Sequence, residues 1–279
     1  MLSESATAQT KVDRAIQLNR DGSFRIWALA GTVRVIGWEK DSVRVRATIP
    51  AADQVHLGGG ASGAKMFVEA VDERNPQAAT IEVTLPKAAK LWVKTATAQV
   101  AISGITGSLD IYTVSGAITV SGSPADLNAE AMDGNISVTG SPRWIRAKSA
   151  SGNVQLRGSS SDATLSTVSG EVSVSGGEFE KAKFESVTGP IRFDGLFVRG
   201  GSIVFDSHSG RIDISIPRLN SADIEVVTIA GKIQNALTGA RAIPGRYGRG
   251  AELITANNGG GTQVTIRSFK GDVTLRATK

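Results

Sequence analysis

Cysteine is absent from this chain of 279 residues, which excludes disulfide bonds and thiolate metal sites and leaves the redox compartment open. Aromatic residues make up only 5%, proline is scarce, and no long helical period appears. No apolar run approaches the roughly 18 residues of a membrane-spanning helix. Lys and Arg total 31 against 26 Asp and Glu, and this small excess is spread along the chain. Because basic residues are neither clustered nor interleaved with aromatics, we expect no nucleic-acid partner.

A glycine that returns at a nearly fixed interval is the main feature that the chain does have. The first four lie 18 residues apart, and the spacing then loosens to 19, 21 and 21 residues. We call these residues the marker glycines: Gly116, Gly134, Gly152, Gly170, Gly189, Gly210 and Gly231. A fixed period near 20 residues predicts stacked structural repeats.

Apolar residues alternate with polar ones on both sides of each marker glycine. Around Gly116 they are Leu109 and Ile111 before it and Ile118 and Val120 after it, and the later repeats keep this spacing. Strict alternation is the period of a half-buried strand. Each repeat therefore holds two short strands joined at the marker glycine, where we expect a tight turn with positive φ. A second glycine closes the following strand in most repeats.

The repeats predict an all-β fold, a single-stranded β-solenoid similar to a β-helix, with about nine coils of ~18–21 residues. In an earlier coil Ala98 occupies the marker position, and Gly271 marks the last coil in the sequence. Stacked coils pool their aliphatic side chains into one continuous core. We expect Phe184, Phe193 and Phe205 to pack in this core, as buried Phe residues usually do.

The chain is expected to divide into three parts. Residues 1–19 are predicted to be a flexible lead-in, and residues 20–90 an N-terminal β cap that is continuous with the solenoid. Residues 91–279 form the solenoid itself, with an insertion at about 236–262. The opening residues lack the apolar core of a secretory signal. We therefore expect an exported protein whose signal sequence has been removed.

Both irregular parts are expected to contain strands. In the cap, the segment 31–38 resembles a marker turn with its strand, and further strands are predicted at 65–70 and 80–85. The cap is expected to cover the first edge of the stack, because exposed sheet edges invite pairing between chains. In the insertion we expect a solvated loop that leads into a closing strand pair, 251–256 with 262–268.

A hydroxyl column precedes the turns. The residue three before the marker glycine is Ser or Thr in most repeats, for example Thr113, Thr167 and Ser207. We expect these hydroxyl groups to satisfy backbone groups of the turn.

Charged residues supply the candidate binding surface. Glu185 and Asp206 share one register, four residues before their marker glycines, so we expect them to lie about 5 Å apart on neighbouring strands. A second group is expected on the other sheet of the same coils, and consists of Arg192, Asp194, Arg211 and Asp213. A third, basic group lies in the insertion and consists of Arg241, Arg246, Tyr247 and Arg249.

These charges permit two interpretations. Exposed, salt-bridged surface is the simpler one, because such pairs are common on β-sheets. In the alternative, carboxylates near Glu185, Asp206 and Asp213 serve a carbohydrate-active parallel β-helix, a polysaccharide lyase or hydrolase. No aromatic platform for stacking sugars is evident in the sequence. We therefore expect no catalytic residues, and no cofactor or metal.

Two further motifs carry little chemistry. The stretch 58–63 matches G-x-G-x-x-G, but no βαβ pattern surrounds it, so we expect a loop. His208 stands two residues before its marker glycine, in a register filled by apolar residues elsewhere. We interpret it as a tolerated wall residue.

The recurring words resemble a known bacterial family. They include Ser-Gly-Ala-Ile-Thr-Val-Ser-Gly at 115–122, Asp-Gly-Asn-Ile-Ser-Val-Thr-Gly at 133–140 and Ser-Gly-Glu-Val-Ser-Val-Ser-Gly at 169–176. These resemble the β-strand-repeat proteins called DUF4097, which are catalogued as candidate adhesins, and the likeness extends over about residues 20–279. The resemblance implies an exported β-solenoid of the periplasm or cell surface and supplies no catalytic residues.

The function we expect is therefore that of a non-enzymatic scaffold or adhesin-like module of the cell envelope. Its polar sheet faces would meet a protein or polysaccharide partner, or a second copy through faces or ends.

Overall fold

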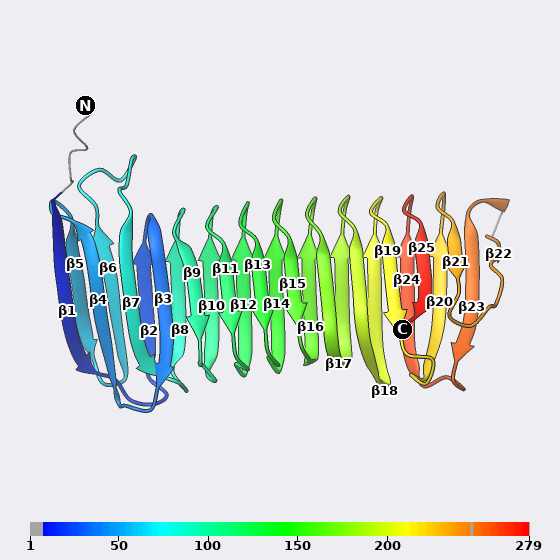
Figure 1. Cartoon of the computed structure of the whole chain (residues 1–279), viewed down its shortest axis with the longest axis horizontal. Helices are drawn as coiled ribbons and strands as arrows, with labels where there is room; N and C mark the ends of the chain where they lie inside the picture. The colour runs from blue at the N-terminus through cyan, green and yellow to red at the C-terminus, as the bar shows by residue number, and fades with distance from the viewer. Residues whose placement is uncertain (1–7, 246–247, 279) are drawn as a thin grey trace. The chain divides into compact units, whose positions relative to one another are not determined.

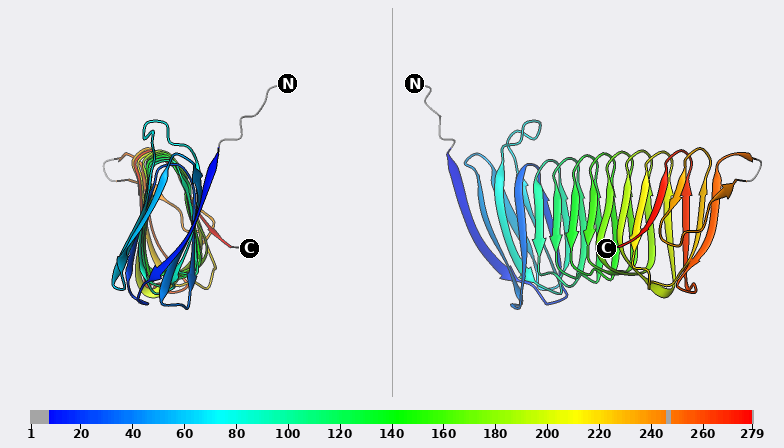
Figure 2. Two further views of the ribbon diagram at one scale, coloured as in Figure 1. Left: turned by 90° about the vertical axis from the view of Figure 1, so that its left-hand side faces the viewer. Right: turned by 45° about the vertical axis from the view of Figure 1, so that its right-hand side comes forward.

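The computed structural model describes residues 8–245 and 248–278, and these residues form strands and turns without any α-helix. They belong to two compact units, which divide between Gly134 and Asn135. The boundary expected at residue 90 thus lies inside the first unit. In the described part of the chain, no helix is long and apolar enough to cross a membrane. Figures 1 and 2 show a β-solenoid-like arrangement within each unit, as the repeat predicts.

The first unit contains twelve strands in its described residues. They are β1 (Gln9–Gln17), β2 (Ser23–Ala28), β3 (Gly31–Trp38), β4 (Ser42–Pro50), β5 (Gln54–Gly60), β6 (Gly63–Glu69), β7 (Ala79–Pro86), β8 (Lys90–Thr95), β9 (Gln99–Ser103), β10 (Ser108–Thr113), β11 (Ile118–Ser121) and β12 (Asp126–Ala131).

From β7 to β12, successive strands alternate between two parallel sheets. One sheet has the order β6, β2, β8, β10, β12, and the other has the order β7, β3, β9, β11. The pairing keeps inward residues in columns, so that Ile26, Val93 and Ile111 lie side by side and are fully buried. The apolar alternation therefore does predict the core.

The order of strands at the start of the chain differs from the expected cap. The segment 31–38 was expected to cover the first edge, yet as β3 it lies between β7 and β9 and pairs in parallel with both. Its inward Val33 and Val35 match the columns of Val100 and Ile102, so it forms part of the stack itself. The cover comes from antiparallel strands: β4 and β1 beyond β7, and β5 beyond β6.

The expected flexible lead-in is wrong for residues 9–17, because these residues form β1 along the edge of β4.

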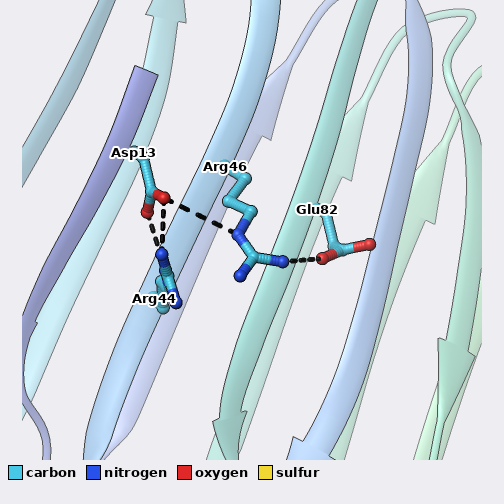
Figure 3. A network of polar contacts seen from close by, with 4 residues as sticks. All are labelled: Asp13, Arg44, Arg46 and Glu82. Atoms are coloured by element: carbon cyan, nitrogen blue, oxygen red, sulfur yellow. Dashed lines mark hydrogen bonds and ion pairs between the residues drawn. The ribbon is translucent and has the colours of Figure 1, made fainter. Parts of the chain in front are cut away.

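A row of charges crosses the strands β1, β4 and β7 (Figure 3). Arg44 donates to both carboxylate oxygens of Asp13, at 2.7 and 2.5 Å. Arg46 lies 3.7 Å from Asp13 and donates to Glu82 at 3.2 Å. The hydrogen bond from Arg44 lowers the pKa of Asp13 below its usual 3.8. Sequence patterns miss β1 because its residues are largely exposed and show no apolar alternation.

The second unit contains thirteen strands in its described residues. They are β13 (Ile136–Thr139), β14 (Trp144–Ser149), β15 (Val154–Arg157), β16 (Ser160–Thr167), β17 (Val172–Ser186), β18 (Ile191–Ser207), β19 (Ile212–Ile216), β20 (Ala222–Thr228), β21 (Ile233–Asn235), β22 (Ile243–Pro244), β23 (Ala251–Asn257), β24 (Thr262–Ser268) and β25 (Val273–Ala277).

Parallel pairing in register also builds this unit. Ile136 lies beside Val154, and Val154 lies beside Val172, in one buried column. Strands β17 and β18 are long because each continues around a corner from one sheet to the other. Their first parts pair with β15 and β19, and their last parts with β16 and β24. A register shift between Ser175 and Lys181 accompanies the corner in β17.

The last winding of the sequence is inserted between two earlier ones. Strand β24 pairs with β18 on one side and with β20 on the other, and β25 lies between β19 and β21 (Figure 1). The expected closing pair, 251–256 with 262–268, is therefore wrong: both strands exist, but β20 separates them. Ile266 of β24 fills the column between Phe205 and Val226, which explains why the insertion preserves the core.

The marker glycines are explained by close backbone stacking, and the positive φ expected for them is wrong. A Cβ atom at Gly116 would overlap the carbonyl oxygen of Ala98, and one at Gly210 would overlap that of Gly189. Positive φ occurs at the glycines that close the strands, for example 69° at Gly104. The two glycines of a repeat thus serve different purposes.

The hydroxyl column has the role that its position predicts. The backbone N–H of Gly116 donates to Thr113 Oγ1 at 3.0 Å, and that of Gly231 donates to Thr228 Oγ1 at 2.9 Å. Ser268 donates in turn to the carbonyl oxygen of Gly271 at 2.7 Å. Each of these hydroxyl groups lies in a buried residue and ties the end of a strand to the turn that follows.

Large aromatic side chains fill the core where the windings of the second unit lengthen. Phe184, Phe193 and Phe205 are buried, as expected, and their ring centroids lie 5.2–5.6 Å apart. Phe179 and Phe197 join the same cluster. Packing within the core accounts for these residues.

Candidate functional site

The first predicted charged pair is brought together on one sheet of the second unit. Glu185 of β17 lies in register beside Asp206 of β18, and Asp206 lies beside Arg267 of β24. Lys183, on the same strand as Glu185, lies 2.7 Å from the Glu185 carboxylate. This contact raises the pKa of Lys183 above its usual value, chiefly through the hydrogen bond. Glu185 is thus held by a neighbouring cation.

The second predicted group lies on the other sheet. Arg192 of β18 and Asp213 of β19 are register neighbours, and Asp194 lies beside Ser215. Arg192 forms an ion pair with Glu171, while Arg211 contacts Asp213 at 2.8 Å. The structure therefore separates Asp213 from Glu185 and Asp206, since the two groups lie on different sheets.

The third predicted group belongs to the segment between β21 and β23. Arg241 and Arg249 are exposed there. Arg246 and Tyr247 lie outside the described residues. The structure places neither Arg241 nor Arg249 with the charged groups on β17, β18 and β19.

His208 lies at the surface. Its ring stacks on Phe269 with a centroid distance of 5.0 Å and an angle of 10°. Both residues line a cleft of about 390 Å³, together with Asp206 and Arg267. Other residues two before the markers are also exposed, among them Val168 and Val187. This register thus forms an apolar surface row, and His208 is one of its members.

The G-x-G-x-x-G stretch forms a β-hairpin and does not form the expected loop. Residues up to Gly60 belong to β5 and those from Gly63 onward to β6, with Gly60 and Gly63 opposite each other. No helix follows that could bind a phosphate at its amino end. In the described part of the chain, no group of three or more His, Asp and Glu side chains could hold a metal ion.

A larger cleft of about 540 Å³ lies on the first unit, where no site is predicted from the sequence. It is lined by outward residues of β2, β8, β10 and β12. Among its lining residues, Trp27 of β2 and Trp92 of β8 meet edge to face, with ring centroids 4.9 Å apart and planes at 61°. Both side chains are half-buried. An aromatic platform is therefore present, contrary to the expectation from the sequence.

Polar side chains stand in rows beside the two Trp rings. In one row Arg25, Trp92, Asp110 and Asn128 are successive register neighbours. Asn128 Nδ2 donates to Asp110 Oδ1 at 2.9 Å. Because parallel strands lie about 4.8 Å apart, each row offers one side chain per strand at that spacing. The cleft thus combines aromatic faces with charged groups of both signs.

The neighbouring row extends the aromatic surface. Trp27, Lys94 and Tyr112 are register neighbours, and Lys94 Nζ lies 5.7 Å from the centre of the Tyr112 ring. These three residues line a second cleft of about 270 Å³. The two clefts adjoin at Trp27, which lines both, and together we call them the tryptophan cleft.

The alternation of inward and outward residues along the strands contains the sequence signal for this cleft. Trp27, Trp92 and Tyr112 all occupy outward positions, between buried residues such as Ile26 and Val93. What the sequence does not reveal is that β2 pairs with β8, because many residues separate them and the repeat is irregular there.

Comparison with known proteins agrees with the fold. The family model described as Toastrack DUF4097 matches residues 37–276. Among solved structures, a candidate lipid-binding protein from Parabacteroides distasonis ATCC 8503 is 16% identical with a TM-score of 0.50, over 96% of this chain and 97% of that chain. A candidate adhesin from Bacteroides fragilis NCTC 9343 is 12% identical with a TM-score of 0.46, over 98% and 99%.

At 16% identity, the similarity to the Parabacteroides protein shows the fold alone. No protein of curated function matches the sequence significantly. The family model covers most of the residues, including the marker glycines and the cleft-lining strands β8, β10 and β12, whereas β2 lies before its first matched residue. The chain belongs to the Toastrack DUF4097 family.

Proposed function

We propose that the protein is a non-enzymatic binding and scaffolding module of the bacterial cell envelope, which presents outward sheet faces to a polymer or protein partner. The observation that supports this proposal is the placement of the carboxylates considered for catalysis. Glu185 and Asp206 lie on one sheet, and Asp213 lies on the other.

Catalytic glycoside cleavage by paired carboxylates requires two such groups on either side of the bond that is broken. Asp206 lines the cleft beside His208 and Phe269, whereas Glu185 and Asp213 do not line that cleft. Glu185 and Asp213 are instead engaged by Lys183 and Arg211 at 2.7 and 2.8 Å. This arrangement favours ion-paired surface and gives the lyase or hydrolase alternative no support.

The finer features of the proposal follow from the repeat and the family. We propose about nine windings of ~18–21 residues, by the periodicity of the marker glycines. The place of action is the periplasm or the cell surface, after removal of a signal sequence. The partner is a protein or polysaccharide, and self-association through faces or ends is a second mode of assembly.

An assay of polysaccharide cleavage tests the non-enzymatic character. The wild type and a triple variant, Glu185→Gln with Asp206→Asn and Asp213→Asn, are incubated with polyuronides and neutral polysaccharides, and released chain ends are measured. We expect neither protein to release ends, while the wild type retains a partner in pull-downs from envelope extracts. Cleavage by the wild type that is lost in the triple variant contradicts the proposal. A variant changed only at Glu180→Gln serves as the matched control, because Glu180 is an exposed carboxylate outside these groups.

A further inference from the structure

We propose that the tryptophan cleft of the first unit binds a neutral oligosaccharide segment. This inference rests on the proposed function, since it names the class of polymer and the face that receives it. Three features of the cleft support a saccharide: its pair of Trp rings, its polar groups of both charges and its row geometry.

The two Trp rings suit the shape of a sugar ring. A pyranose presents C–H groups on its faces and hydroxyl groups around its edge. Indole rings offer large, rigid apolar faces whose negative quadrupole attracts such C–H groups. Trp27 and Trp92 are half-buried outward residues that line the 540 Å³ cleft, and Trp27 and Tyr112 both line the adjoining cleft.

The polar groups of the cleft carry both signs of charge, which suits the binding of hydroxyl groups. Arg25 and Lys90 supply donors, while Asp110 and Asp126 supply acceptors. Among the described residues, no ion pair joins either cation to either carboxylate, although all four line the same cleft. A hydroxyl group is both donor and acceptor, so it can use both signs of charge at once.

The balance of charge favours a neutral ligand. Two cations and two carboxylates line the main cleft, so an anionic polymer would meet Asp110 and Asp126 as well as the cations. A lipid acyl chain would have to desolvate four charged groups, which is costly. An added peptide strand needs an open sheet edge, whereas β2, β8 and β10 each have strands on both sides. A neutral saccharide avoids all three difficulties.

The rows give the ligand a direction. Strands β2, β8, β10 and β12 place Arg25, Trp92, Asp110 and Asn128 in one line across the sheet. The spacing of about 4.8 Å between strands is comparable to the length of one sugar unit in an extended polysaccharide. A chain lying across the strands can therefore offer one sugar to each strand. The hydrogen bond from Asn128 orients the Asp110 carboxylate along this line.

Binding is tested on the whole protein by titration calorimetry and tryptophan fluorescence. The probes are cellohexaose, chitohexaose, laminarihexaose and maltohexaose, with oligogalacturonate and anionic phospholipid vesicles as other occupants. We expect saturable binding of at least one neutral hexasaccharide. Trp92→Ala should weaken that binding about tenfold, through loss of stacking. Trp144→Ala is the matched control, because Trp144 is also an outward Trp, 52% exposed, on β14 of the second unit.

Two further variants keep the test decisive if Trp92→Ala fails to fold in a thermal melt. Trp92→Phe should retain part of the affinity, and Asp110→Asn should reduce it several-fold while preserving side-chain shape. Absence of binding to every neutral probe overturns the inference, and so does equal binding by the wild type and these variants. Preference for oligogalacturonate or vesicles overturns it as well.

The same samples separate this inference from the proposed function. The length of each hexasaccharide is measured after incubation with the protein. Shortened chains contradict a non-enzymatic module and leave the cleft as a binding site. Intact chains that do not bind contradict the cleft and leave the scaffold proposal standing.

Discussion

At the marker positions, the missing side chain matters because each winding lies directly on the backbone of its neighbour. Gly210 approaches the carbonyl of Gly189, and Gly271 approaches that of Gly210. The same contacts give the order of windings, since Gly231 approaches Gly271. Only a residue without Cβ fits such an approach. Conformational freedom is needed elsewhere, at strand-closing glycines such as Gly104.

Replacing a marker glycine therefore tests the stacking. Gly116→Ala should lower the free energy of unfolding by about 2 kcal/mol or more, because the added methyl overlaps the carbonyl of Ala98 and forces the windings apart. Gly60→Ala is the control in the same unit, since a Cβ there meets nothing within 4 Å and its φ is not positive. Denaturant unfolding measures both. Equal effects in the two variants would contradict the stacking account.

The buried hydroxyl column offers a second comparison at this scale. Ser268 donates to Gly271, whereas Ser186 Oγ has no hydrogen-bond partner among the described residues. Ser268→Ala should cost about 1 kcal/mol of unfolding free energy. Ser186→Ala should stay within about 0.5 kcal/mol of the wild type, because no bond is lost. Chemical denaturation distinguishes them, and a larger loss at Ser186 would show that the column is not a set of local turn bonds.

At the scale of strands, the sequence predicts which residues form windings but not their order in space. The apolar pattern of Val264 and Ile266 is the same as that of Ile224 and Val226. The pattern alone therefore does not determine which strand lies beside which in the core. Periodicity therefore identifies β24 without placing it between β18 and β20. The same holds for β2 and β3, whose neighbours β6 and β7 follow later in the chain. The pairing partners decide the topology, and no local pattern encodes them.

Strand β1 is the element whose attachment depends most directly on charge. The pKa of Asp13 is lowered in the folded protein, first by its hydrogen bond from Arg44. A carboxyl group with a lowered folded pKa contributes stability above its unfolded pKa of about 4, and this contribution is lost as the pH falls through the folded value. We expect the protection of β1 amides to decline below about pH 4.

Hydrogen exchange, corrected for the intrinsic rate at each pH, measures this protection. Asp13→Asn should lower the protection of β1 at neutral pH and remove its acid dependence. Amides of β10 serve as the internal control, since they lie in the stack and away from this network. Acid-independent protection of β1 in the wild type would contradict the role of the ion pair.

For the molecule as a whole, the sequence predicts the fold class and part of the surface. The register places Glu185 beside Asp206 and assigns Asp213 to the other sheet, because regular repeats convert sequence spacing into position. The tryptophan cleft could not be predicted in this way. It depends on Trp27 and Trp92 becoming neighbours, and that pairing arises where the repeat is irregular.

Windings stacked through glycine hold outward side chains in rows, because inward columns keep the strands in register. We propose that one such row on the first unit binds a neutral saccharide without cleaving it. In this proposal, function depends on outward positions that lie outside the inward columns of the core.

Amide proton–nitrogen correlation spectra of the whole protein, recorded while each neutral hexasaccharide is added, test this claim most directly. We expect saturable shifts concentrated in β2, β8, β10 and β12 for at least one of the sugars, with its chain length unchanged. Shifts confined to the second unit, or none with any of the four sugars, would contradict it.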